Sequence, residues 1–223
     1  MNLTSQNQIN LYGLNSQLIE LIELYKKNKL PNKILLSGQK GIGKCTLAYH
    51  LINYILSIDE EYNYDLKNFS INIENKSFKL IQNKTNPNFI LIDVADDKKK
   101  IDIAQIRNMI NNLNKSSFNS KPRFVLIDNI EYLNLNSVNA LLKILEEPAK
   151  DTHFILVNNN KKILPTLQSR CLNFKIHLTN INNKAICNKL LNIDIDNAIN
   201  IDLLDYYLTP GKIYNLTIFS NEN

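Results

Sequence analysis

The sequence predicts an α/β fold in which helices cover both faces of a parallel β-sheet. Short, continuously apolar segments alternate with segments of helical periodicity, as expected for strands buried on both faces of such a sheet. The first apolar segment runs into a glycine-rich turn followed directly by a helix, and no long linker interrupts the pattern. The 223 residues, 44% of them hydrophobic, are enough to bury a large core.

Along the chain, the first expected helix has apolar positions at helical spacing and ends before Pro31. The five expected strands are short apolar runs at residues 33–37, 89–94, 123–128, 153–157 and 171–176. The expected helices of this part span residues 14–29, 44–57, 103–113, 136–147 and 164–169. Residues 59–88 are rich in Asn, Asp, Glu and Tyr with weak periodicity, which predicts a variable insertion. From about residue 179 the pattern is helical only, so we expect an α/β domain over 1–178 and a short helical segment over 179–223.

Composition and cysteine usage limit the partners and the cellular compartment that we expect for the protein. The net charge of +5 permits an anionic partner without requiring one. No run of eighteen apolar residues predicts a membrane span, and the first ten residues lack the pattern of a secretory signal. The three cysteines form no CxxC pair, which fits a reducing compartment, so we expect a cytoplasmic protein. His50, His153 and His177 are isolated and have no metal-ligand spacing, so core or surface roles are expected.

A phosphate-binding loop is predicted at residues 38–45, GQKGIGKC, which fit G-x-x-x-x-G-K with Cys where Ser or Thr is expected. The glycines let successive backbone N–H groups turn toward one anion, and the lysine adds a positive charge at the β- and γ-phosphates. A thiol substitutes poorly for the hydroxyl that ligates Mg²⁺, and Thr46 lies about 100° further round the helix. The loop therefore predicts the fold more strongly than binding of ATP and Mg²⁺. The candidate nucleotide-binding residues are Gly38, Gly41, Gly43, Lys44, Cys45 and Thr46.

An acidic residue ends the strand RFVLID, where a P-loop ATPase holds its Mg²⁺. Asp128 is well placed for that metal. The next residue, Asn129, cannot act as a carboxylate base, and we expect Glu131 to point in another direction once the strand has ended. Efficient hydrolysis of ATP by this chain alone is therefore not expected.

Three segments carry a resemblance to a known family: NALLKILEEP (139–148), FILVNN (154–159) and LPTLQSRC (164–171). Residues 29–48 and 101–110 add to it. Together these segments resemble the clamp-loader branch of the AAA+ ATPases, and within it the delta-prime subunits of bacterial DNA polymerase III. The resemblance implies an AAA+ sheet followed by a small helical lid domain, here incomplete.

The resemblance also implies roles for single residues. In clamp loaders, ATP lies between neighbouring subunits, and the arginine of the SRC motif reaches the neighbour's γ-phosphate. That arginine corresponds to Arg170, and the bland alternative is a surface arginine that caps a helix C-terminus. Asn158 or Asn159 stands at the sensor 1 position, and we take Asn158. The segment LTPGKIYNL (208–216) resembles the sensor 2 region, with Lys212 in place of the usual arginine.

Partners and further domains are implied in the same way. The expected partners are the gamma/tau and delta subunits, and through the complex the sliding clamp and primer-template DNA. Delta-prime proteins commonly carry a four-cysteine zinc module after the phosphate-loop helix, but residues 59–88 contain no cysteine, so no zinc is expected. The helical collar domain of the family is expected to be missing, because the sequence ends at Asn223.

Two other functions stay open. In the first, the chain is a stand-alone P-loop ATPase in which Lys44 and Asp128 work with an unidentified water-orienting group. In the second, it is a structural relative that has lost both nucleotide binding and ring assembly.

Overall fold

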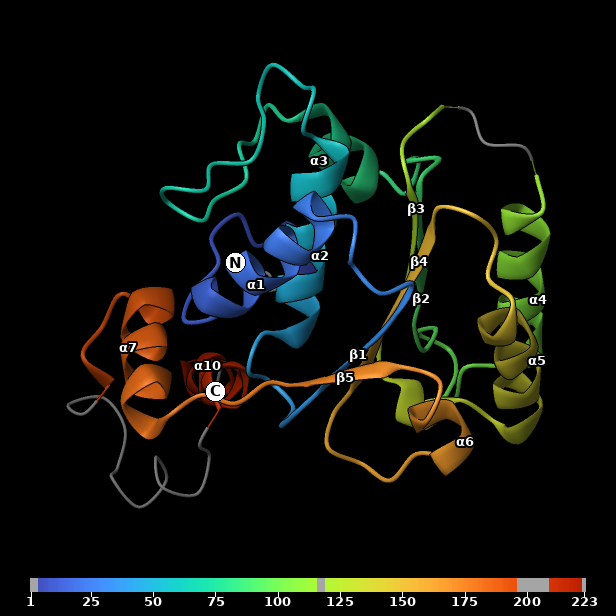
Figure 1. Ribbon diagram of the computed structural model, residues 1–223. Coiled ribbons are helices and arrows are strands. Elements are labelled where there is room, and N and C mark those ends of the chain that lie inside the picture. Colours follow the sequence, from blue (N-terminus) through green and yellow to red (C-terminus); the bar gives the residue numbers. More distant parts are fainter. Residues whose placement is uncertain (1–3, 116–118, 196–208, 222–223) are drawn as a thin grey trace.

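The computed structural model describes residues 4–115, 119–195 and 209–221. Its centre is a parallel sheet of five strands in the order β2-β3-β4-β1-β5 (Figure 1). The strands are β1 (Lys33–Ser37), β2 (Phe89–Ile92), β3 (Arg123–Ile127), β4 (Thr152–Asn158) and β5 (Leu172–Lys175). All five expected strands are thus confirmed, with ends that shift by one or two residues.

Helices cover both faces of this sheet, as the sequence predicts. In Figure 1, α1 and α2 lie on one face, and α4 and α5 lie side by side on the other. The helices of the sheet region are α1 (Asn15–Lys26), α2 (Lys44–Leu56), α3 (Lys76–Gln82), α4 (Ile103–Leu113), α5 (Leu135–Glu146) and α6 (Pro165–Gln168). Two 3-10 turns, η1 (Ser5–Asn7) and η2 (Ile130–Tyr132), complete this part. None of the helices described is both long and apolar enough to cross a membrane.

The core is divided in two by the sheet, because successive side chains of a strand point to opposite faces. Leu36 and Val157 are paired in register and pack on the side of α1 and α2. Leu35 and Leu156, also paired, pack on the side of α4 and α5. The alternation explains why whole strands are apolar, since neither face is exposed to water.

The segment 59–88 is more ordered than a variable insertion suggests. It contains α3, whose first turn is capped by the Asn75 side chain accepting from the Phe78 N–H. Phe78 is buried with the α1–α2 core. Tyr64 from the same segment contacts buried His50 of α2 at 2.7 Å. Weak sequence periodicity here reflects a short helix and a packed coil rather than an absent structure.

After residue 179 the structure describes two helices, α7 (Asn180–Leu191) and α10 (Pro210–Asn221). They pack together around Cys187, Ile195 and Ile213, apart from the two main clusters. Residues 196–208 lie outside the described residues, so the all-helical expectation for 179–223 applies to the described part alone. Figure 1 shows α7 and α10 beside the end of β1 from which the phosphate loop leaves.

Candidate functional site

The phosphate loop connects β1 to α2 and depends on its glycines. A side chain on Gly38 would place its Cβ 2.2 Å from the Ile176 carbonyl oxygen beyond β5. Gly41 has a φ of +90°, which favours glycine, and a Cβ there would lie 2.8 Å from the Thr209 hydroxyl. Gly43, also at a φ of +90°, is the N-cap of α2. The loop therefore depends on glycine for close contacts at Gly38 and Gly41 and for a positive φ at Gly41 and Gly43.

Lys44 is the most deeply placed charge of the site, with 3% of its surface exposed. Its Nζ donates to the Gly38 and Gln39 carbonyl oxygens at 2.9 and 2.6 Å, and to Asn159 Oδ1 at 3.0 Å. Burial lowers the pKa of Lys44 to about 8, although the charges of Asp128 and Glu131 act in the opposite direction. The ammonium group of Lys44 is thus held inside the loop by carbonyl groups of the loop itself.

Cys45 and Asp128 meet beside this lysine. Both residues line the same pocket, and each affects the pKa of the other. Burial is the largest cause of the raised pKa of the thiol, and burial also raises the pKa of Asp128, with nearby Asp93 contributing. A thiol that keeps its proton does not ligate Mg²⁺, a cation that prefers oxygen. The loop residues therefore fit a phosphate group, whereas residue 45 does not fit the metal.

A polar network at the ends of β2, β3 and β4 joins these groups, and its centre is Asn159. The Asn159 Nδ2 donates to Asn129 Oδ1 at 2.7 Å and to Glu131 Oε1 at 3.0 Å, while its Oδ1 accepts from Lys44. Asn129 in turn donates to Asp93 Oδ1 at 2.8 Å. One amide side chain thus links the lysine of the phosphate loop to the chain that follows β3.

Asn158, the residue expected at sensor 1, donates through its Nδ2 to the Lys161 carbonyl oxygen at 3.0 Å. One expectation about this network is wrong: Glu131 does not point elsewhere, because its carboxylate accepts from the Asn159 side chain. The reason is local: Asn129 adopts a left-handed conformation with a φ of 55°, and η2 then carries Glu131 toward the end of β4.

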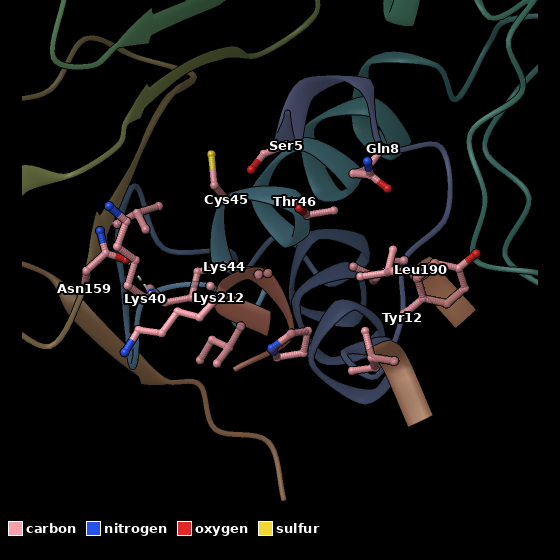
Figure 2. Close-up of a pocket in the computed structure, with 18 of the residues that line it drawn as sticks. Ser5, Gln8, Tyr12, Lys40, Lys44, Cys45, Thr46, Asn159, Leu190 and Lys212 are labelled. Atoms are coloured by element: carbon pink, nitrogen blue, oxygen red, sulfur yellow. Dashed lines mark hydrogen bonds between the residues drawn. The ribbon is translucent and has the colours of Figure 1, made fainter. Parts of the chain in front are cut away.

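A pocket of about 350 Å³ lies over the loop. Figure 2 shows Asn159 and the loop lysines at one end and Tyr12 with Leu190 of α7 at the other. One end is polar and the other is largely apolar. The candidate residues Gly41, Gly43, Lys44, Cys45, Thr46, Asp128 and Lys212 all line this pocket.

The start of α10 sits directly on the phosphate loop. The Gly211 N–H donates to the Gly41 carbonyl oxygen at 2.9 Å, and the Thr209 hydroxyl donates to the Lys40 carbonyl oxygen at 2.8 Å. Lys212 is exposed at the pocket edge. The helical segment therefore closes one side of the pocket, and its position is coupled to the loop.

Arg170 follows α6 and does not line this pocket. Its Nη1 donates to the Thr166 carbonyl oxygen at 2.9 Å, as the helix-capping alternative predicts, and its Nη2 pairs with Glu146 Oε1 of α5 at 2.5 Å. The structure thus brings the loop residues, Asp128 and Lys212 together, and keeps Arg170 apart from them.

Comparison with known proteins identifies the family. Residues 13–180, well over half of the chain, match the sequence profile of the family described as DNA polymerase III, delta subunit. The chain belongs to this family. The matched stretch begins just before α1 and ends at the start of α7, so it contains the whole sheet and the phosphate loop.

Curated relatives of this delta-subunit family member are longer than the chain. It is 28% identical over 204 residues to DNA polymerase III subunit delta' of Buchnera aphidicola subsp. Baizongia pistaciae, a match covering 88% of this chain and 59% of that protein. It is 32% identical over 156 residues to DNA polymerase III subunit gamma of Buchnera aphidicola subsp. Schizaphis graminum, covering 69% and 40%. The chain spans about half the length of these relatives.

Among solved structures, the RuvB Holliday junction branch migration motor of Thermotoga maritima superposes with a TM-score of 0.55. The two proteins share 17% sequence identity, and the match covers 96% of this chain and 64% of that one. At this identity the likeness concerns the fold alone. It supports the expected α/β fold, in which helices cover both faces of a parallel sheet.

Proposed function

We propose that this chain acts in DNA replication as a delta-prime-like subunit of the DNA polymerase III clamp loader. In this role it belongs to the polymerase holoenzyme and donates Arg170 to the ATP site of a neighbouring gamma/tau subunit. The delta subunit is a further partner, and the sliding clamp and primer-template DNA are contacted through the complex. Family membership supports the role, and the residues of the two sites support the division of labour.

The placement of Arg170 is the observation that carries this proposal. It lies outside the chain's own phosphate-loop pocket, on the surface near the ends of α5 and α6. A guanidinium supplied in trans offsets the charge that develops on a transferring phosphoryl group, which contributes about 10³–10⁵ in rate. Because Arg170 lies outside the chain's own pocket, its position supports a role at a nucleotide that another molecule holds.

The chain's own pocket is suited to holding a nucleotide more than to cleaving it. The loop backbone and Lys44 are placed for phosphates, and the end formed by Tyr12 and Leu190 offers apolar surface to a base. Against turnover, Cys45 keeps its proton and Asn129 replaces a carboxylate. A bound Mg²⁺ would supply charge neutralisation at the phosphates, and Asp128 would hold it. Lys212 would face the same phosphates from α10.

One observation favours the stand-alone ATPase. Glu131 lies in the network around Asn159, and its charge acts on Lys44, so a carboxylate is available near the loop. Water orientation by Glu131 would supply the group that the sequence left unidentified.

Hydrolysis assays separate these functions. For the proposed role, the chain alone shows negligible ATP turnover, and its addition stimulates the clamp-loader ATPase subunits of the same organism unless Arg170 is changed to Ala. Robust turnover by the chain alone that vanishes in Lys44→Ala would establish the ATPase instead. No effect of either variant in any mixture would indicate a structural relative without nucleotide chemistry.

A further inference from the structure

The side chain of Arg170 is folded back onto the protein. Its 32% exposed side chain lies between the backbone of the preceding helix, α6, and Glu146, whose side chain is 54% exposed. The two contacts come from opposite ends of the fork: Nη1 to the Thr166 carbonyl oxygen at 2.9 Å and Nη2 to Glu146 Oε1 at 2.5 Å. In the isolated chain, the arginine is therefore retracted and paired with a carboxylate of the same chain.

This arrangement opposes what a trans-acting arginine has to do. An arginine finger needs reach, because it crosses an interface, and an unpaired positive charge, because it stabilises negative charge on phosphate oxygens. Glu146 offsets that charge, and the backbone contact shortens the reach. The Thr166 contact alone leaves the charge unpaired, so the carboxylate is the element that competes with a phosphate.

We propose that Glu146 is an autoinhibitory partner of Arg170: it holds the finger retracted and neutralised until phosphate oxygens of a nucleotide on the neighbouring subunit replace its carboxylate. This inference rests on the function proposed above. The exchange is energetically easy, because an ion pair exposed to water is weak, and its loss changes an equilibrium by only about 1.5- to 5-fold. The pair therefore tunes engagement of the finger and does not block it.

Removing the charge of Glu146 tests the proposal in the reconstituted complex. Glu146→Gln keeps the size of the side chain and removes the competing charge. Increasing amounts of full-length chain are added to the partner ATPase subunits with clamp, primed DNA and ATP. The half-saturating concentration of the variant should fall about 1.5- to 5-fold, while the turnover at saturation stays near that of the wild type.

The matched control is Glu147→Gln, because Glu147 carries the same charge one residue further along and forms no ion pair with any residue that the structure describes. It should leave the half-saturating concentration unchanged. The difference between Glu146→Gln and the wild type should also shrink at high ionic strength, which screens exposed pairs. A purely structural role of Glu146 would produce neither effect.

The outcomes keep the two proposals apart. If Arg170→Ala leaves partner turnover unchanged, the finger itself is refuted. If Arg170→Ala abolishes stimulation but Glu146→Gln behaves as the wild type, only the autoinhibitory role is overturned. A higher half-saturating concentration for Glu146→Gln than for the wild type would overturn it as well. That result would make Glu146 a residue that orients the finger productively.

Discussion

His50 makes the stability of the protein depend on pH in a predictable way. Its Nε2 contacts the Gln8 carbonyl oxygen at 3.1 Å, and its Nδ1 contacts the Tyr64 hydroxyl at 2.7 Å. A carbonyl oxygen only accepts, so Nε2 carries the proton and Nδ1 accepts from the tyrosine. Burial lowers the pKa of His50 from 6.5 to about 4. The neutral ring therefore joins the N-terminal segment and the 59–88 segment to α2.

The sign and size of the effect follow from the pKa difference. Between pH 6.5 and 4 the unfolded chain binds a proton at this position and the folded chain does not, so stability falls as the pH is lowered. Between pH 7 and pH 5, His50 should remove about 2 kcal/mol from the free energy of unfolding.

Urea unfolding of the wild type and of His50→Gln at both pH values measures this contribution. The variant keeps one donor and one acceptor but cannot take up the proton, so its loss between pH 7 and pH 5 should be about 2 kcal/mol smaller than that of the wild type. His177→Gln, at an exposed histidine, is the matched control and should keep the loss of the wild type. Equal losses in the wild type and His50→Gln would refute the reasoning.

Three further predictions concern the site. The pKa of Lys44 is lowered from 10.5 to about 8, so between these values the unfolded chain binds a proton that the folded chain does not. From pH 7 to pH 10 the free energy of unfolding of the wild type, measured in urea, should therefore rise by about 1–2 kcal/mol relative to that of Lys44→Met. Gly211→Ala would place a Cβ 2.9 Å from the phosphate-loop backbone, so it should destabilise the protein by about 1–2 kcal/mol, although alanine favours helices. Asn215→Ala on the same helix should instead stabilise it by about 0.5 kcal/mol, and equal effects of the two would contradict the docking of α10. Asn159→Ala removes one of the three acceptors of Lys44, so it should speed amine labelling of this lysine, read by mass spectrometry. Equally fast labelling in Asn158→Ala would contradict the conclusion that Asn159, and not Asn158, holds Lys44.

Much of the fold could be predicted because its signals are local. The strand 33–37 and the helix 103–113 have the bounds expected from sequence. The helix begins at a capping box, in which Asp102 and Gln105 satisfy each other's backbone N–H groups, and its apolar stripe is regular. The helix α3 was missed because it is short and its stability comes from burial of Phe78 among residues distant in sequence.

The site likewise contains residues that local sequence motifs predict and residues that only the tertiary structure brings in. The phosphate loop and Asp128 belong to contiguous motifs, so the sequence suffices to place them. The role of Asn159 depends on where β4 ends relative to the loop, and adjacent asparagines are indistinguishable without that geometry. Glu131 is brought in by a left-handed residue that the sequence does not mark. Docking of α10 on Gly41 is a tertiary contact between segments 170 residues apart, a separation no local pattern encodes.

The most direct test of the account is the rate of ATP hydrolysis by the partner ATPase subunits, assembled with this chain, clamp and primed DNA, and compared between the wild type, Arg170→Lys and Arg170→Ala. Lysine keeps the charge but lacks the planar fork of donors. The account predicts that in both variants the rate of ATP hydrolysis at the sites this chain completes falls by about 10³-fold or more, while assembly is retained. Unchanged turnover with Arg170→Ala in an assembled complex would contradict it.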